Sequence, residues 1–144
     1  MKNVLFYSHD FNLCYSLLMY LQESYSVTAT TNLKAIGAFA GSAEFDLIIL
    51  DDTPNKEVIE LCRELREKKP EVPVIITYVF DKNIKDIEPS LRQYVTSIFY
   101  KPYDLNEVTM KMASLMVWPF TPQHIFFIGI SFLIFPNALL TNLE

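Results

Sequence analysis

The chain has 144 residues, of which 51% are hydrophobic and 20% are charged, a balance typical of one folded globular domain. This composition excludes an intrinsically disordered chain, and a formal net charge of −5 argues against a general nucleic-acid-binding surface. The charges are unevenly placed, because every Lys and Arg lies at or before Lys111 and residues 112–143 carry no charged side chain. We therefore divide the chain into a balanced domain, residues 1–117, and an apolar C-terminal extension, residues 118–144.

Five short runs of apolar or β-branched residues are spread along the domain. They are expected to be strands at residues 4–7, 27–30, 47–50, 74–77 and 97–100. Between them, apolar residues recur every three or four positions, which predicts amphipathic helices. Strands alternating with helices indicate an α/β fold in which a doubly wound, five-stranded parallel sheet is covered on both faces. Right-handed crossovers then place all five strand ends along one edge.

The helical sequence pattern is clearer in some of these segments than in others. In chain order, they cover residues 13–21, 34–40, 57–69, 84–91 and 105–115. The third is the clearest, with an apolar face, a charged face and Pro70 at its end. The fourth is the least secure because Pro89 interrupts it. The fifth is expected to be capped at its start by Asp104 or Asn106.

The two cysteines, Cys14 and Cys62, lie inside helical patterns and lack the spacing of a metal site. The sequence from Met1 onward shows no secretory leader pattern. We therefore expect a cytoplasmic protein with reduced cysteines in its core.

Polar and ionisable residues follow the expected strands, and Asp51 and Asp52 are the most informative of them. They end the buried run 47–50, and a carboxylate is too costly to bury without a partner. The other strand ends supply Ser8, His9 and Asp10; Thr77 or Tyr78; and Tyr100, Lys101 and Pro102. A carboxylate facing a lysine, with a hydroxyl nearby, suits phosphoryl transfer. The carboxylate oxygen attacks phosphorus while a divalent cation and the lysine neutralise the phosphoryl oxygens.

Four segments, residues 2–10, 46–55, 73–78 and 100–108, occur in the order and near the spacing of a known family. Residues 2–116 resemble the CheY-like receiver domain of two-component response regulators. The resemblance implies a flavodoxin-like (βα)5 fold with strand order 2-1-3-4-5. It covers about four fifths of the chain, with the apolar extension beyond it.

The resemblance implies a role for each matching site residue. Asp51 matches the phosphoacceptor, and Lys101 matches the lysine that contacts the phosphoryl group. Thr77 is favoured as the switch hydroxyl, although counting along the strand from Pro73 puts Tyr78 at that position. Thr53 would contribute its backbone carbonyl to a Mg²⁺ site.

The chain departs from the family where the first strand ends, because receivers usually place two acidic residues there to hold Mg²⁺. An ungapped alignment puts Ser8 and His9 at these positions, and a shift of one residue puts His9 and Asp10 there. The shifted alignment is favoured because it also matches the buried positions of the first helix. It predicts a weakened Mg²⁺ site made by Asp10, Asp51 and the carbonyl of Thr53, since imidazole is a poor Mg²⁺ ligand. The position of the family's aromatic switch residue is Ile98.

The function implied by the resemblance is that of an atypical receiver. It would take a phosphoryl group on Asp51 from a histidine kinase or phosphotransfer protein and signal by contact with a downstream protein target. It would not be an enzyme acting on a separate substrate. The alternative is a phosphorylation-independent pseudo-receiver that serves as an interaction or dimerisation module. A nucleotide or flavin binder is disfavoured because the chain has three glycines and no glycine-rich loop.

The extension contains an apolar run at residues 125–135, which is too short to cross a bilayer as a helix. Left exposed, such a segment drives association. We favour homodimerisation through the extension over packing on its own domain and over membrane contact. No nucleic-acid-binding motif is visible.

Overall fold

The computed structural model of the chain describes residues 1–116, so the extension, residues 118–144, lies outside the described part. Strands and helices alternate throughout. The elements are β1 (Asn3–Ser8), α1 (Phe11–Leu21), β2 (Ser26–Thr30), α2 (Leu33–Ser42), β3 (Leu47–Asp51), α3 (Lys56–Lys68), β4 (Val74–Tyr78), α4 (Glu88–Arg92), β5 (Ser97–Tyr100) and α5 (Leu105–Met116).

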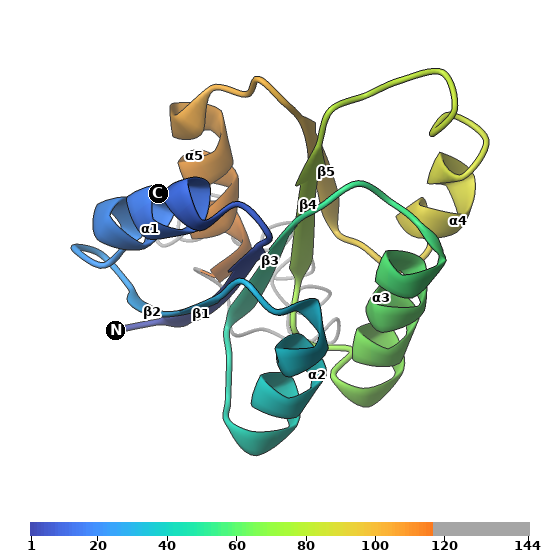
Figure 1. The fold of residues 1–144 in the computed structure, drawn as a ribbon. Coiled ribbons are helices and arrows are strands. Elements are labelled where there is room, and N and C mark those ends of the chain that lie inside the picture. Colours follow the sequence, from blue (N-terminus) through green and yellow to red (C-terminus); the bar gives the residue numbers. More distant parts are fainter. Residues whose placement is uncertain (117–144) are drawn as a thin grey trace, which may run out of the picture.

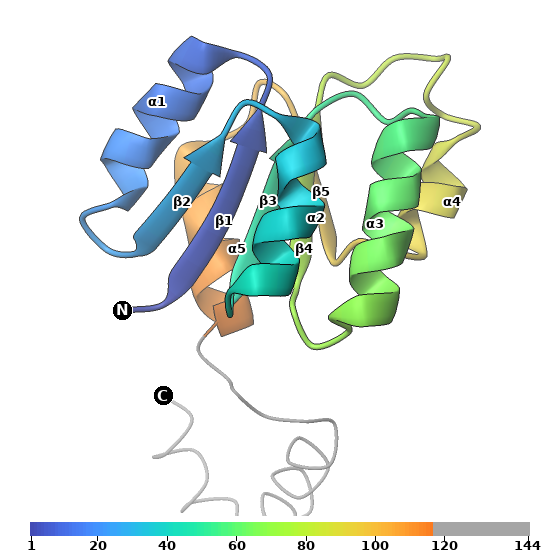
Figure 2. The same ribbon diagram turned by 60° about the horizontal axis from the view of Figure 1, so that its bottom comes forward.

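The five strands pair in parallel in the order β2-β1-β3-β4-β5. This confirms the predicted doubly wound sheet and its strand order. Every residue of β3 and β4 is buried, as expected for central strands covered on both faces. In Figure 1, α1 and α5 lie on one side of the sheet, and α2, α3 and α4 lie on the other. In Figure 2, β1 and β2 lie side by side and point toward the same edge.

The core consists of two apolar layers, one on each face of the sheet, because successive strand side chains point to opposite faces. On β1, Leu5 packs in the layer under α2, α3 and α4. Its neighbour Phe6 packs in the other layer, together with residues of α1 and α5. This alternation decides which side chain at each strand end faces which helices.

Side-chain caps fix the starts of four helices. Asp10 caps α1, Asn32 caps α2 and Asn55 caps α3, each accepting a hydrogen bond from a backbone N–H of the first turn. Of the two residues predicted to cap the last helix, Asp104 is the one that does so, accepting from the N–H of Asn106 at 2.8 Å.

Helix α4 is shorter than the sequence pattern predicted. It spans only Glu88–Arg92, and Ile84 and Ile87 lie in the turns before it. Pro89 therefore sits in the first turn, where its missing N–H costs nothing, and does not interrupt the helix. The predicted interruption was wrong because the helix begins at Glu88, so that Pro89 lies in its first turn and not in its interior.

Both cysteines are free and buried. Burial raises the pKa of the Cys62 thiol to about 12, and it also raises the pKa of Cys14. Both thiols are therefore protonated and unreactive at neutral pH. Among residues 1–116, no helix is both long enough and apolar enough to cross a membrane.

Candidate functional site

Asp51, the last residue of β3, is only 2% exposed. Three donors meet its carboxylate: the hydroxyls of Ser8 and Thr77 and the ammonium group of Lys101. They come from the ends of β1, β4 and β5, so the site exists only because parallel strands end at one edge. Throughout residues 1–116, every fully buried polar side-chain atom has a hydrogen-bond partner. The cost of burying the carboxylate is therefore offset by complete pairing.

Ser8 is paired directly with Asp51 in the register between β1 and β3. It is fully buried, and its Oγ donates a hydrogen bond to Asp51 Oδ2 at 2.7 Å. The same Oγ accepts from the backbone N–H of Asp10 at 3.1 Å. A neutral hydroxyl therefore occupies the place beside Asp51 at the end of β1.

Thr77 is the hydroxyl that faces Asp51. Its Oγ1 donates to Asp51 Oδ1 at 2.7 Å, and the two residues are paired in the register of β3 with β4. Tyr78 points to the opposite face of the sheet, where it packs under α4. The alternation of side chains places Thr77 in the predicted position, without any bulge.

Lys101 follows β5 directly. Its Nζ lies 3.1 Å from Asp51 Oδ1 and 3.4 Å from Oδ2. The Lys101 side chain is 33% exposed, so it reaches the buried carboxylate from the solvent side. The peptide bond between Lys101 and Pro102 is cis. The predicted approach of Lys101 and Thr77 to Asp51 is thus present in the structure.

The other predicted site residues, Asp10 and Thr53, make their hydrogen bonds with groups other than Asp51. The carboxylate of Asp10 accepts from the N–H groups of Asn12 and Leu13, capping α1. The N–H of Thr53 donates to the side chain of Asp52 at 2.8 Å. The register therefore pairs Ser8, and not Asp10, with Asp51, while the part of Asp10 in a metal site stays a prediction.

A known protein resembles this chain in sequence. The transcriptional regulatory protein ResD of Bacillus subtilis (strain 168) is 30% identical over 104 residues, which are 69% of this chain and 42% of that protein. The chain thus spans less than half the length of this curated relative. No protein-family model matches the chain.

Solved structures of response regulators share the fold. A two-component response regulator from Clostridium difficile matches with a TM-score of 0.69 at 19% identity, over 80% of this chain and 95% of that one. The response regulator TrrA from Thermotoga maritima, in complex with Mg²⁺ and BeF, matches with a TM-score of 0.68 at 24% identity, over 80% and 99%. The sequence relationship and the shared fold agree. This chain contains a CheY-like receiver domain.

The residues of this receiver domain do not fit a Mg²⁺ ion beside Asp51. Mg²⁺ requires hard oxygen ligands, usually carboxylates, in a near-octahedral arrangement. Here the place next to Asp51 holds the neutral hydroxyl of Ser8, and Asp10 is engaged as a helix cap. Within residues 1–116, no cluster of three or more His, Cys, Asp or Glu side chains is suited to a metal ion. The role of Asp10 and of the Thr53 carbonyl in a metal site remains a prediction, and the capping of α1 by Asp10 argues against the part of Asp10 in it.

Asp52, the neighbour of Asp51, accepts a hydrogen bond from a tyrosine of the receiver domain. The hydroxyl of Tyr7 donates to Asp52 Oδ2 at 3.0 Å. Tyr7 is buried in the layer under α2, α3 and α4, so this bond lies across the sheet from the Asp51 network. Burial, together with the hydrogen bond to Asp52, raises the pKa of Tyr7 to about 12.

The raised pKa of Tyr7 predicts that the domain loses stability at alkaline pH. Its pKa is 10.0 when unperturbed and about 12 in the folded state, so between these values the unfolded state binds fewer protons. The free energy of unfolding should therefore be unaffected by Tyr7 below pH 10 and should fall as the pH rises from 10 to 12. The measurement is the urea midpoint against pH for wild type and Tyr7→Phe. The decline should be shallower in the variant, and parallel curves would contradict the prediction.

A second polar cluster joins α4 to the sheet on the far side of β4. The hydroxyls of Tyr78 and Tyr100 both donate to Oε1 of Glu88, and Arg92 lies 3.9 Å from the other oxygen of that carboxylate. Burial and the hydrogen bond to Glu88 raise the pKa of Tyr78. The ring of Phe80 packs edge-to-face on Tyr100. Receiver residues at the ends of β4 and β5 are therefore tied to a helix on the opposite side from Asp51.

Sequence reasoning missed two of these contacts. Ser8 was weighed only as a substitute for an acidic residue, although its place in the register of β1 makes it the direct neighbour of Asp51. The Glu88 cluster was not foreseen. The available signal was the period of two along the strands, which places Tyr78 and Tyr100 on the face opposite Thr77.

Proposed function

We propose that this receiver domain signals by protein–protein contact, as an interaction module of the two-component type, without needing a phosphoryl group on Asp51. The observation that carries the proposal is Ser8, a neutral hydroxyl bonded to Asp51 where a metal-binding carboxylate would be required. With Thr77 and Lys101, it completes the pairing of the carboxylate. The site is thereby a closed polar network that joins the ends of four strands, β1, β3, β4 and β5.

A second candidate is phosphorylation of Asp51 by a histidine kinase or a phosphotransfer protein. It is favoured by the convergence of Thr77 and Lys101 on the carboxylate. In this reaction an Asp51 oxygen would attack phosphorus and form an acyl phosphate, while the bond between phosphorus and the donor histidine nitrogen breaks. Lys101 would neutralise charge on the phosphoryl oxygens, and Thr77 would donate a hydrogen bond to one of them.

One experiment separates the two candidates. The full chain is incubated with phosphoramidate, with and without Mg²⁺, and the intact protein mass is measured. Because the site lacks a metal-binding set, we expect no phosphoryl adduct in either condition. An adduct that requires Mg²⁺ and disappears in Asp51→Asn, but persists in the matched control Asp52→Asn, would overturn the proposal in favour of the second candidate.

We also propose that the chain forms a homodimer in which the extension, residues 118–144, takes part. The support is compositional: residues 112–143 carry no charged side chain, and residues 125–135 are apolar apart from Ser131. Sedimentation of the full chain should show a dimer that Ile128→Asp with Phe132→Asp dissociates. An unchanged dimer in this double variant would count against a role for the extension. The downstream protein target and a cytoplasmic location likewise remain proposals.

A further inference from the structure

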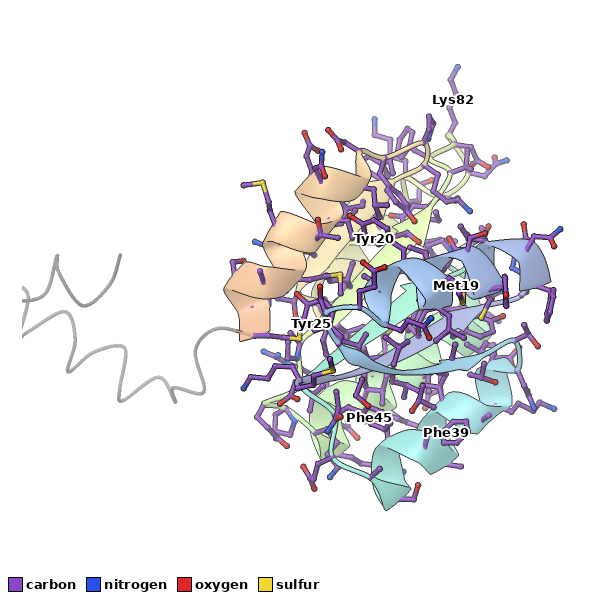
Figure 3. The ribbon with its side chains drawn as sticks, turned by 90° about the vertical axis from the view of Figure 1, so that its left-hand side faces the viewer. Met19, Tyr20, Tyr25, Phe39, Phe45 and Lys82 are labelled. Carbon is purple, nitrogen blue, oxygen red and sulfur yellow. The ribbon has the colours of Figure 1, made fainter. Side chains whose placement is uncertain are left out.

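Helix α1 carries an apolar stripe on its outer surface. Residues 11–21 contain no charged side chain. Phe11, Tyr15 and Met19 are spaced four residues apart and therefore lie on one face, and they are 68%, 55% and 45% exposed. Tyr20, at the edge of this stripe, is 48% exposed. Figure 3 looks onto α1 and labels Met19 and Tyr20 on it.

The stripe is not needed for the domain's own core. The residues of α1 that are buried against the sheet are Cys14 and Leu21, which belong to the layer shared with α5. The rings of Phe11 and Tyr15 stack on each other, with centroids 6.3 Å apart. Beside them a groove runs between α1 and β2, the edge strand of the sheet. This is an ordered apolar surface of the kind that often marks an interaction site.

The chain beyond the described residues starts on the same side of the sheet. Met116, at the end of α5, and Leu21, at the end of α1, belong to one core layer. The apolar run at residues 125–135 begins nine residues after Met116. The eight intervening residues can span at most about 26–29 Å. The α1 stripe and the point where the extension begins therefore lie on one side of the sheet.

The area of the stripe shows what kind of partner it needs. A large side chain buries about 150–250 Å², so the exposed fractions of these four residues amount to roughly 400 Å² per copy. A stable interface takes about 800 Å² from each partner. Two stripes alone would thus give about half of that area, and the uncharged extension is a further apolar segment of this chain. Since α1 is uncharged, two copies meet there without like-charge repulsion.

We infer that α1 is the centre of a homodimer interface, in which the Phe11–Tyr15–Met19 stripe packs on the same stripe of a second copy and the apolar extension enlarges the contact. The inference rests on the proposed homodimer and names its surface. A two-fold axis would bring identical patches together, so each copy supplies the same side chains.

Analytical ultracentrifugation of the full chain tests the inference. Tyr15→Glu with Met19→Glu should raise the dimer dissociation constant about 100-fold, because it places charges in an apolar contact. The matched control is Val79→Glu, which alters an exposed apolar residue after β4, on the other half of the sheet. It should leave the dimer unchanged. In addition, Tyr15→Cys should crosslink to itself across the dimer with a short bismaleimide, since the two natural cysteines are buried.

Each outcome has a defined meaning. A dimer that the α1 variant leaves intact but Ile128→Asp with Phe132→Asp dissociates would overturn the inference and leave the proposed dimer standing. A wild-type monomer would overturn both. A monomer in which the extension substitutions increase thiol labelling of Tyr15→Cys would show that the extension covers α1 within one chain, which also overturns the inference.

Discussion

Replacing Ser8 with aspartate is expected to destabilise the receiver domain in the absence of metal and to create a response to Mg²⁺. The substitution places a second carboxylate against the buried carboxylate of Asp51, where Ser8 now donates at 2.7 Å. Two like charges in one buried site repel, and we expect a loss of about 3 kcal/mol in the free energy of unfolding. Mg²⁺ would bind the new pair in the folded state only, and at 100 times its dissociation constant it would restore about 2.7 kcal/mol.

The measurement is the urea midpoint of the full chain with and without Mg²⁺. Ser8→Ala serves as the control, since it removes the hydroxyl without adding charge and should show no Mg²⁺ response. Ser8→Asp combined with His9→Asp restores the acidic pair of the ungapped alignment and should respond more strongly than Ser8→Asp alone. A wild-type protein stabilised by Mg²⁺ as much as these variants would refute the assignment of Ser8 as the residue that disables the metal site.

Replacing Lys101 with methionine is expected to cost about 2 kcal/mol in the free energy of unfolding. Asp51 is almost wholly buried and would lose its only cationic partner among residues 1–116. Removing one member of a fully buried pair costs about 3–5 kcal/mol, and the partial exposure of Lys101 reduces this value. The hydroxyls of Ser8 and Thr77 would remain as donors.

Two comparisons make this result specific. Asp51→Asn removes the charge that Lys101 neutralises, so the double variant should be less destabilised than the sum of the two single variants. Arg63→Met breaks exposed ion pairs with Glu60 and Glu67 on α3, and it should cost less than about 1 kcal/mol. If the Lys101 and Asp51 substitutions proved additive in urea unfolding, the ion pair would not be coupled as described.

The fold and the approach of Lys101 to Asp51 could be predicted because both depend on regular geometry. Alternating strands and helices force a parallel sheet with one functional edge, and this brings Asp51 and Lys101 together although they are fifty residues apart. The end of β1 was harder to predict. A slip of one residue exchanges the two faces of a strand, and Ser8, His9 and Asp10 offered a plausible polar residue in either alignment.

The Glu88 cluster could not be predicted for a different reason. Its contacts join two strands to α4, and neither the length of α4 nor its position over the sheet follows from the strand pattern. The apolar residues before Pro89 indicated a longer helix than Glu88–Arg92. A side-chain bond between a strand and a separate helix depends on tertiary packing, which a periodic pattern does not specify.

The two tyrosine hydroxyls on Glu88 have a mechanical consequence for the receiver. Tyr78 adjoins Thr77 on β4, so the same strand holds the Asp51 network on one face and α4 on the other. Hydrogen bonds to a charged group contribute about 1.5–3 kcal/mol each. Displacing α4 therefore means releasing Tyr78 and Tyr100 from one oxygen atom, and the two bonds resist that movement jointly. Helix α4 should therefore have two positions, one with both hydrogen bonds formed and one with both broken, and should not shift gradually between them.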